Sequence, residues 1–492
     1  MFPLLNESEK IGRVVSTESG PTHSVVDVRL DPGKRVRPGA LLYAPVSEEQ
    51  VETLVVVLRV SNVKEHNPYE DPLSSQVRDQ FGIRSSIKTE DLIRKYFVAT
   101  TQPIELLTLR EGQILSEDPY LLATAGTPVY PNIPGIAAQV LGFPSPDDRG
   151  ALVIGKIVGS QDGVVLDADR VLPRHILVAG STGTGKSYLL GKIAEELYRT
   201  GIRHVNIDVH GETCAAAEKM GGINLVPGEN LMVRLSSLEE PEVMAMLPLT
   251  HELHVDIVTK AFINLKRSGR PFTVEDFARE SERVAVPYGV KQNTIDIVTA
   301  RIDTLRQIRI LGEGFDWKQA LATRGAFVNI DCRELTHSEL RTMVGAVARE
   351  LIALRKRGEI MPLVLSMDEA HLFLPGGREV TTSSRVVSEL IRFGRHHGVG
   401  LILSSQSPAD IDRRIAKITN TRFFFAIEPS ELASVSGLMG DAPPELIANL
   451  PRFKVGSCLL VGSRDTIKHA VAVEVGLRTT PHGGETPRMT ED

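Results

Sequence analysis

The sequence predicts an α/β protein: a parallel sheet that carries a phosphate-binding loop and a helical insertion, preceded by an N-terminal β-barrel domain. Three observations support this fold class. A Gly-x-x-x-x-Gly-Lys-Ser motif follows an apolar strand at residues 180–187, and apolar runs alternate with helical patterns from about Ala151 onward. The part before Gly150 consists of short apolar runs separated by Pro and Gly. At 492 residues, the chain is also too long for a single hydrophobic core.

The N-terminal part is expected to be rich in β-strands. Short apolar or alternating runs recur at 11–15, 24–30, 41–45, 51–60 and 104–109. Their spacing fits a small barrel or sandwich. The polar stretch 62–96 is expected to be an excursion or partly helical. Residues 1–148 offer no catalytic constellation, so we interpret them as a barrel for assembly or partner docking; a plain folding role is the alternative.

The remaining chain is expected to form a core from residues 149–235 and 322–476. Nearly continuous apolar runs, typical of a parallel sheet buried on both faces, lie at 176–179, 204–208, 326–331, 363–368, 400–405, 422–427 and 457–461. Residues 236–321 show helical patterns, with a capping signature from Thr273 to Asp276, and are expected to form a helical insertion. The polar tail 477–492 is expected to be extended.

The phosphate-loop motif predicts binding of a nucleoside triphosphate. Its glycines let backbone N–H groups turn toward phosphate oxygens, and the helix that follows adds a partial positive charge at its N-terminus. Lys186 would reach the outer phosphates, and the Ser187 hydroxyl would ligate Mg²⁺. The residues expected to contact the nucleotide are Gly180, Thr182, Gly183, Thr184, Gly185, Lys186, Ser187 and Tyr188.

Two acidic residues, Asp368 and Glu369, end a second apolar strand, at the edge where ligands of open α/β sheets bind. Asp368 can hold Mg²⁺ through water, and Glu369 can polarise a water that attacks a terminal phosphate. Acidic pairs at strand ends are common, but in a chain that also carries a phosphate loop this pair indicates a hydrolase. The letters Asp-Glu-Ala-His also occur in helicases with two tandem sheet domains. We reject that class because only one sheet core is readable here.

Four further residues are candidates for the site, each with a plainer alternative. Gln406 ends the strand 400–405 and would sense the terminal phosphate, or merely satisfy the local backbone. Glu212 could approach the attacking water, or be a solvated turn residue. Arg392 and Arg395 share a helix face. They are either favoured there by the helix dipole, or donated into a neighbouring subunit's site as an arginine finger.

Composition narrows the possible functions. The net charge of −6, from 56 Lys+Arg and 62 Asp+Glu, argues against a surface coated with basic residues, but leaves room for a local basic channel. No apolar run is long enough to span a bilayer, and the N-terminus lacks the basic start of a signal peptide. Three scattered cysteines suggest neither a zinc site nor a disulfide framework. A cytoplasmic location is therefore expected.

Taken in order, these motifs resemble the HerA branch of the HerA–FtsK ring ATPases. The likeness covers about Ala151 to Val475. It rests on the phosphate loop, the Asp-x-His-Gly-Glu turn at 208–212, Glu-Ala-His at 369–371, the run 394–401 and Ser405-Gln406. It implies a RecA-like P-loop core, ATP and Mg²⁺ as cofactors, a homo-hexamer, and no membrane partner. The implied activity is ATP-driven translocation or unwinding of double-stranded DNA, in end processing with a NurA-type nuclease.

The resemblance also implies roles for individual residues. The ATPase centre would consist of Lys186, Ser187, Asp368 and Glu369. The sensor would be Gln406, and the finger donated in trans would be Arg392 or Arg395. Arg174, in the Arg-His pair before the phosphate-loop strand, would contact a neighbour's nucleotide or the base. Thr213 stands where the family has a tyrosine. The insertion matches no motif, so no loop can be assigned to gripping DNA.

Two other functions stay open. One is a ring ATPase that acts on protein, as an unfoldase or a secretion motor, which the net negative charge mildly favours. The other is a nucleotide-switched scaffold for a partner effector. Slow hydrolysis that responds to a partner protein but not to duplex DNA would indicate the scaffold.

Overall fold

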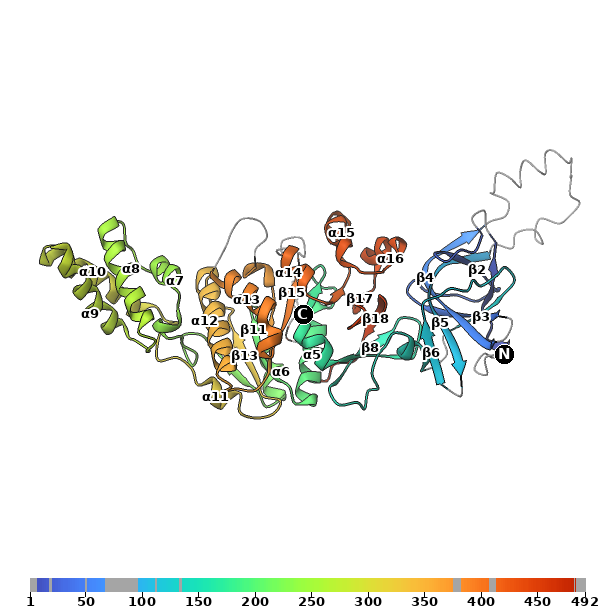
Figure 1. The fold of residues 1–492 in the computed structure, drawn as a ribbon, viewed down its shortest axis with the longest axis horizontal. Helices are drawn as coiled ribbons and strands as arrows, with labels where there is room; N and C mark the ends of the chain where they lie inside the picture. The colour runs from blue at the N-terminus through green and yellow to red at the C-terminus, as the bar shows by residue number, and fades with distance from the viewer. Residues whose placement is uncertain are drawn as a thin grey trace, which may run out of the picture. The chain divides into compact units, whose positions relative to one another are not determined.

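The structure, a computed structural model, describes residues 7–16, 20–48, 51–66, 96–110, 113–131, 135–374, 382–406, 413–481 and 483 (Figure 1). The chain divides into two compact units. The first comprises Met1–Asp167 and Phe424–Gly476, and the second Ala168–Phe423 and Leu477–Asp492. Each unit is described by itself.

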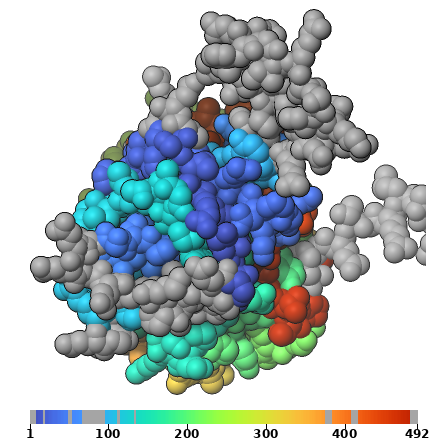
Figure 2. Space-filling model, turned by 90° about the vertical axis from the view of Figure 1, so that its right-hand side faces the viewer, coloured from blue at the N-terminus to red at the C-terminus, as the bar shows by residue number. Residues whose placement is uncertain are grey.

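The first unit contains a closed β-barrel. Its strands follow the order β2-β1-β7-β3-β4-β5, β5 pairs back with β2, and β6 extends the sheet from β5. Figure 2 shows the barrel surface in blue and cyan. The strands are β1 (Gly12–Val15), β2 (Val26–Leu30), β3 (Leu41–Glu48), β4 (Val51–His66), β5 (Tyr96–Arg110), β6 (Gln113–Glu117) and β7 (Pro128–Pro131). The expectation of an N-terminal barrel is thus confirmed.

Alternation along the strands builds the barrel core. Leu54, Val56, Leu58 and Val60, every second residue of β4, belong to one buried cluster. β4 continues past this run to His66 and pairs with the start of β5, with Asn62 opposite Thr100. Residues 62–66 are therefore strand rather than the start of a polar excursion, because pairing with β5 satisfies their backbone groups. Residues 67–95 lie outside the described part of the chain.

The rest of the first unit adds an antiparallel sheet, β17-β18-β8-β9. β8 and β9 differ from the strand–helix alternation expected from Ala151 onward. The connection between them is too short for a parallel crossover, so they form a hairpin. The elements are α3 (Ile136–Val140), β8 (Ala151–Ile157), β9 (Gly163–Asp167), α15 (Pro429–Val435), α16 (Pro444–Asn449), β17 (Ser457–Gly462) and β18 (Val471–Val475).

A buried charge network joins the barrel to the C-terminal part of the first unit. Arg59 of β4 is fully buried, and its guanidinium donates to the Ala470 carbonyl at 2.7 Å and the Asp441 carboxylate at 3.3 Å. His469 bridges two carboxylates, with Nδ1 3.0 Å from Asp441 and Nε2 2.6 Å from Glu105. Because each buried charge has an opposite partner, the network avoids the large cost of isolated buried ions.

The second unit contains a sheet in the order β12-β13-β11-β14-β15-β10-β16. The registered pairs among β12, β13, β11, β14, β15 and β10 are all parallel, which confirms the predicted parallel sheet. α5 packs on β11 and α13 on β15. The elements are α4 (Ala168–Val171), β10 (Ile176–Ala179), α5 (Lys186–Thr200), β11 (Arg203–Asp208), α6 (Cys214–Lys219), β12 (Ile223–Leu225), β13 (Phe327–Asp331), α12 (His337–Lys356), β14 (Leu363–Met367), α13 (Thr382–His397), β15 (Val399–Ser405), α14 (Arg413–Ile418) and β16 (Thr421–Phe424).

In the sequence, a group of helices that packs around its own core follows β12 and precedes β13; it is yellow-green in Figure 1. Phe262 makes edge-to-face contacts with Phe272 and Phe277, which fixes α9 against α8. The predicted cap is present: Thr273 and Asp276 form a reciprocal capping box at the start of α9. The helices are α7 (Glu240–Met246), α8 (Glu252–Arg267), α9 (Val274–Ala285), α10 (Gln292–Asp303) and α11 (Trp317–Ala320).

Candidate active site

The phosphate loop connects the C-terminal end of β10 to the first turn of α5. Gly183 and Gly185 have φ angles of 73° and 117°, which L side chains rarely adopt, so these two positions require glycine. The Thr184 hydroxyl donates to the Ser181 carbonyl at 2.7 Å and closes the loop on itself. The loop therefore has the shape that directs successive N–H groups toward one anion.

Lys186 opens α5 and points back into the loop. Its Nζ donates to the Ser181 carbonyl at 3.0 Å, and the residue is only 6% exposed. Burial lowers the pKa of the ammonium, while the nearby carboxylates of Glu369, Asp368 and Glu212 raise it. A desolvated cation inside a ring of acids and loop carbonyls is suited to binding a phosphate group.

The two acids after β14 differ in environment. Burial raises the pKa of Asp368, and the charge of Glu369 raises it further. Glu369 is 5% exposed and has a φ of 47°, a left-handed conformation that is uncommon for a non-glycine residue. Its N–H donates to its neighbour's Oδ1 at 2.9 Å. Such local strain concentrates at functional sites, where surrounding contacts hold it in place.

Gln406 links the phosphate loop to this glutamate. The Thr182 hydroxyl donates to the Gln406 amide oxygen, and the Gln406 amide N–H donates to Glu369 Oε1. Two histidines lie on the same carboxylate: His371 Nδ1 is 3.3 Å from Oε2 and His210 Nε2 is 3.7 Å from Oε1. Burial alone would raise the pKa of Glu369, but hydrogen bonds from His371 and Gln406 outweigh it and lower the pKa.

The turn after β11 is organised by Asp208. Its carboxylate accepts from the N–H groups of Gly211 at 2.8 Å, Glu212 at 3.1 Å and Thr213 at 2.8 Å. These three bonds fix the turn that carries His210 and Glu212 toward the phosphate loop. Asp208 itself is only 3% exposed, so it shapes the turn and does not face solvent.

His175, the residue before β10, holds three elements together. Its Nδ1 accepts from the Leu401 N–H at 3.1 Å, and its Nε2 donates to the Ile391 carbonyl at 3.0 Å. Burial lowers its pKa to about 4, so the ring is neutral. Sequence reasoning missed this role. The nearest signal is the glycine at 394, where an added Cβ would lie 3.2 Å from the imidazole and 2.6 Å from the Val399 carbonyl.

The predicted arginines do not join this cluster within one chain. Arg392 and Arg395 lie on α13 with exposed side chains. Arg174 lies in the short helical turn Leu172–Arg174 before β10, at the opposite end of that strand from the phosphate loop. A role for any of them in catalysis requires a second subunit.

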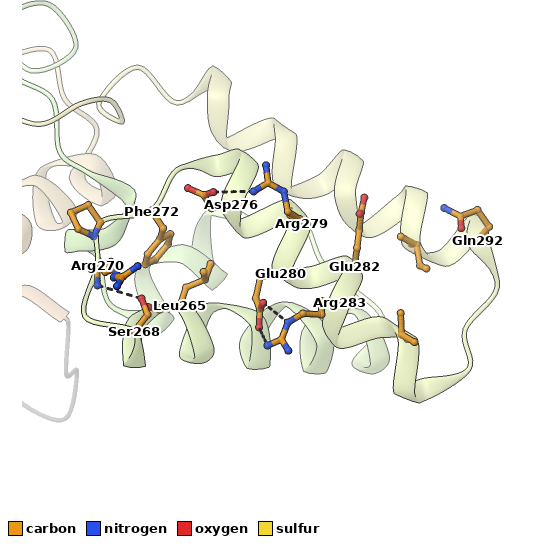
Figure 3. A pocket seen from close by; sticks show the side chains of 13 residues that line it. Leu265, Ser268, Arg270, Phe272, Asp276, Arg279, Glu280, Glu282, Arg283 and Gln292 are labelled. Carbon is orange, nitrogen blue, oxygen red and sulfur yellow. Dashed lines mark hydrogen bonds and ion pairs between the residues drawn. The ribbon is translucent and has the colours of Figure 1, made fainter.

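A larger cavity lies elsewhere, in the helical insertion, with a volume of about 780 Å³. Figure 3 shows its lining along α9, where Asp276 pairs with Arg279 and Glu280 with Arg283. These charges neutralise each other, and the lining carries no glycine-rich loop. The lining of this cavity therefore offers no counterpart of the phosphate loop.

The residues at the loop fit a Mg²⁺–nucleotide ligand. Among the described residues, no group of three or more His, Cys, Asp or Glu side chains could hold a metal alone. Magnesium at phosphate sites needs fewer protein ligands, because phosphate oxygens and water complete its octahedron. Ser187 and Asp368 both line the narrow cavity beside the loop and would supply the hydroxyl and the carboxylate.

In the described part of the chain, no helix has the length and apolar character needed to cross a bilayer.

Comparison with known proteins shows which proteins this chain is similar to. Residues 152–351 match the family model described as "Helicase HerA, central domain". A probable helicase of Methanocaldococcus jannaschii is 24% identical over 388 residues, 74% of each chain. A DNA double-strand break repair helicase HerA of Sulfurisphaera tokodaii is 21% identical over 490 residues, 93% of this chain and 92% of that one. The solved structure of VirB4 of Thermoanaerobacter pseudethanolicus covers 68% of this chain and 98% of its own, at 15% identity and a TM-score of 0.52, and shares the fold.

Proposed function

Because this chain is a HerA-type ATPase that uses ATP and Mg²⁺, we propose that it is an ATP-driven translocase or helicase that acts on double-stranded DNA. The observation that carries the ATP-hydrolysis part of the proposal is the bridge from Thr182 through Gln406 to Glu369. It connects the loop that would hold the phosphates with the carboxylate that would activate water. The similar proteins are named as helicases, two of them in double-strand break repair, which supports a role in DNA end processing.

The geometry supports hydrolysis with the following roles. Lys186 would bind the outer phosphates. Ser187, and Asp368 through water, would hold Mg²⁺, which would supply charge neutralisation at the transferred phosphoryl group. Glu369 accepts the proton of the attacking water at its carboxylate. The lowered pKa keeps this carboxylate ionised at neutral pH, as a general base must be. Glu212 lies on the turn beside it and would orient the water.

We further propose a homo-hexameric ring with a RecA-like core in each subunit. A ring accounts for Arg392 and Arg395, whose exposed side chains on α13 would enter a neighbour's site as the arginine finger. Arg174 would contact a neighbour's nucleotide. The barrel of residues 1–148 would dock a NurA-type nuclease, with the core in 149–235 and 322–476 and the helical insertion in 236–321.

Steady-state ATP hydrolysis with and without long linear duplex DNA tests the proposal, with Glu369→Gln as the blank. We expect several-fold stimulation by DNA that weakens steeply with salt, because phosphate contacts release counterions. Hydrolysis that is indifferent to every nucleic acid would overturn the DNA proposal. If a partner protein then changed the rate, the chain would be a protein-directed motor or a nucleotide-switched scaffold.

A further inference from the structure

A row of buried polar side chains crosses the parallel sheet of the second unit. In the strand register, Asn224 of β12 lies opposite Asn329 of β13. Asn206 of β11 lies opposite Asn329 on one side and opposite Ser366 of β14 on the other. Asn206, Asn329 and Ser366 are buried. Asparagine is depleted in strands, and a buried amide is costly unless it is hydrogen-bonded, so packing alone would favour apolar residues at these positions.

Side-chain hydrogen bonds join the row into one continuous chain. The Ser366 hydroxyl donates to Asn206 Oδ1 at 2.5 Å, and the Asn206 amide donates to Asn329 Oδ1 at 2.8 Å. The Asn329 amide donates to Asn224 Oδ1 at 3.1 Å. His204 extends the chain at one end, where its Nε2 lies 2.6 Å from the Ser366 hydroxyl. We call these five residues the polar relay: His204, Ser366, Asn206, Asn329 and Asn224.

A backbone carbonyl fixes the direction of every bond in the polar relay. The Asn224 amide donates to the Cys214 carbonyl at 3.1 Å, and a carbonyl can only accept. Asn224 therefore turns its oxygen toward Asn329, and the same choice passes from amide to amide as far as Ser366. His204 Nε2 must then donate to the Ser366 hydroxyl. Because burial lowers the pKa of His204 to about 3, the ring is neutral and carries its hydrogen on Nε2. Bonds aligned in one direction polarise and strengthen each other.

The two ends of the polar relay lie beside the elements that carry acids of the ATP site. Ser366 is two residues before Asp368, which follows β14. At the other end, Cys214 begins α6 and is two residues after Glu212. The relay therefore connects the strand that presents one acid with the end of the turn that presents the other.

We propose that Asn206 and Asn329 are positioning residues for ATP hydrolysis, because the polar relay holds Asp368 in register with the Glu212 turn. The inference rests on the proposed roles of these two acids in Mg²⁺ binding and water orientation. Apolar contacts are non-directional, whereas hydrogen bonds have a narrow range of geometry. A misplacement of about 1 Å can slow a reaction about a hundredfold, so this register affects kcat. Asn329 also contacts the turn itself, since its Nδ2 lies 3.5 Å from Asp208 Oδ2.

Basal hydrolysis without DNA tests this role, so the outcome of the DNA proposal does not affect the result. Asn329→Leu keeps a side chain of similar size and removes both relay bonds of the residue. We expect kcat to fall at least about tenfold, whereas Kd for ATP without Mg²⁺ should stay within about twofold, because Lys186 and the phosphate loop are untouched. If the wild type hydrolyses ATP and this variant has the same kcat, the relay proposal alone fails.

Val328→Ala is the matched control. Val328 precedes Asn329 in β13, is 0% exposed and faces the other side of the sheet, because side chains alternate along a strand. Its truncation leaves a cavity that destabilises the same strand without removing a relay bond, so kcat should stay within about twofold of the wild type. A similar fall in kcat in both variants would indicate general destabilisation and would overturn the proposal.

Urea unfolding tests the continuity of the polar relay without any measurement of activity. Asn329→Leu leaves the Asn206 amide and the Asn224 oxygen without partners. The double variant Asn206→Leu/Asn329→Leu also leaves two groups without partners, on Ser366 and Asn224. We therefore expect the double variant to lower the urea midpoint about as much as Asn329→Leu alone. Shifts that add up from the two single variants would contradict a continuous relay.

Asn224→Ala keeps the proposal testable if the variants of buried residues do not fold. Asn224 is half-buried on the edge strand β12, so the groups that lose their partners there can bond to water. Loss of its bonds to Asn329 and the Cys214 carbonyl should lower kcat about threefold and leave Kd for ATP unchanged. A wild-type kcat in this folded variant would overturn the proposal.

Discussion

Two variants of His175, one with alanine and one with glycine, separate the energetic cost of a strained backbone conformation from the cost of losing two buried hydrogen bonds. His175 has a φ of 63° and a ψ of 150°, a combination found almost only in glycine. Its ring nevertheless joins the Leu401 N–H to the Ile391 carbonyl. Both variants lose these bonds, but only glycine relieves the strain. The order of their stabilities therefore reports the strain directly.

The magnitudes follow from these contacts. Each buried group left without its partner costs about 1–3 kcal/mol, so losing both bonds should destabilise the second unit by about 2–6 kcal/mol. The strained conformation costs about 1–3 kcal/mol, which glycine recovers. Glycine also gives up roughly 0.5–1 kcal/mol relative to alanine through the entropy of the unfolded chain. We therefore expect His175→Gly to be more stable than His175→Ala by about 1 kcal/mol, within a range of about 0–2.5 kcal/mol, which is the reverse of the usual order.

Trp317 provides the assay. It is the single tryptophan of the chain, lies in the second unit and is 1% exposed, so its fluorescence during urea unfolding follows that unit. The linear dependence of unfolding free energy on urea gives the two values. An alanine variant as stable as the glycine variant, or more so, would refute the strain argument.

The same residue predicts a pH dependence. Burial holds the pKa of folded His175 at about 4, below its ordinary value of 6.5, so the unfolded chain binds a proton first as the pH falls. The wild type should lose up to about 3 kcal/mol of stability between pH 6.5 and 4 from this residue. Either variant should lose less over that range. Other buried groups titrate in all three proteins, so the difference between the curves isolates His175.

Three further predictions concern the active site and the first unit. Lys186→Ala should abolish nucleotide binding, whereas Glu369→Gln should bind ATP normally and hydrolyse it at least about a hundredfold more slowly, a contrast that equilibrium binding and turnover together reveal. Burial lowers the pKa of His469, but its bonds to Asp441 and Glu105 outweigh burial and raise it. Its stabilising effect should thus be complete below pH 6.5 and vanish as the pH rises through the folded-state pKa; calorimetry of His469→Gln should lack this dependence. Arg59→Met should lower the free energy of unfolding of the first unit by about 1–3 kcal/mol, because it leaves the buried Ala470 carbonyl without its donor; an unchanged melting temperature in calorimetry would contradict this.

Local patterns in the sequence are enough to predict several parts of this fold. Five strands begin and end within one residue of their predicted bounds: β10, β11, β13, β14 and β15. Each is a nearly continuous apolar run, which is typical of a strand in a parallel sheet that is buried on both faces. The phosphate loop could be read from its glycines and Lys186 alone. The hydrophobic alternation in β4 likewise indicated the barrel core.

Contacts between side chains far apart in the sequence become visible only once the chain is folded. His175 bonds to a residue 226 positions away, and Glu195 to one 285 positions away, and neither pair has a signature in the sequence. Gly191 looks like an ordinary helix glycine until Arg478 is placed on it. The sequence places Gln406 at the end of a strand, but nothing in it indicates that this side chain bridges Thr182 and Glu369. Hydrogen bonds across such separations depend on how the elements pack, and packing is a property of the whole chain rather than of any local pattern.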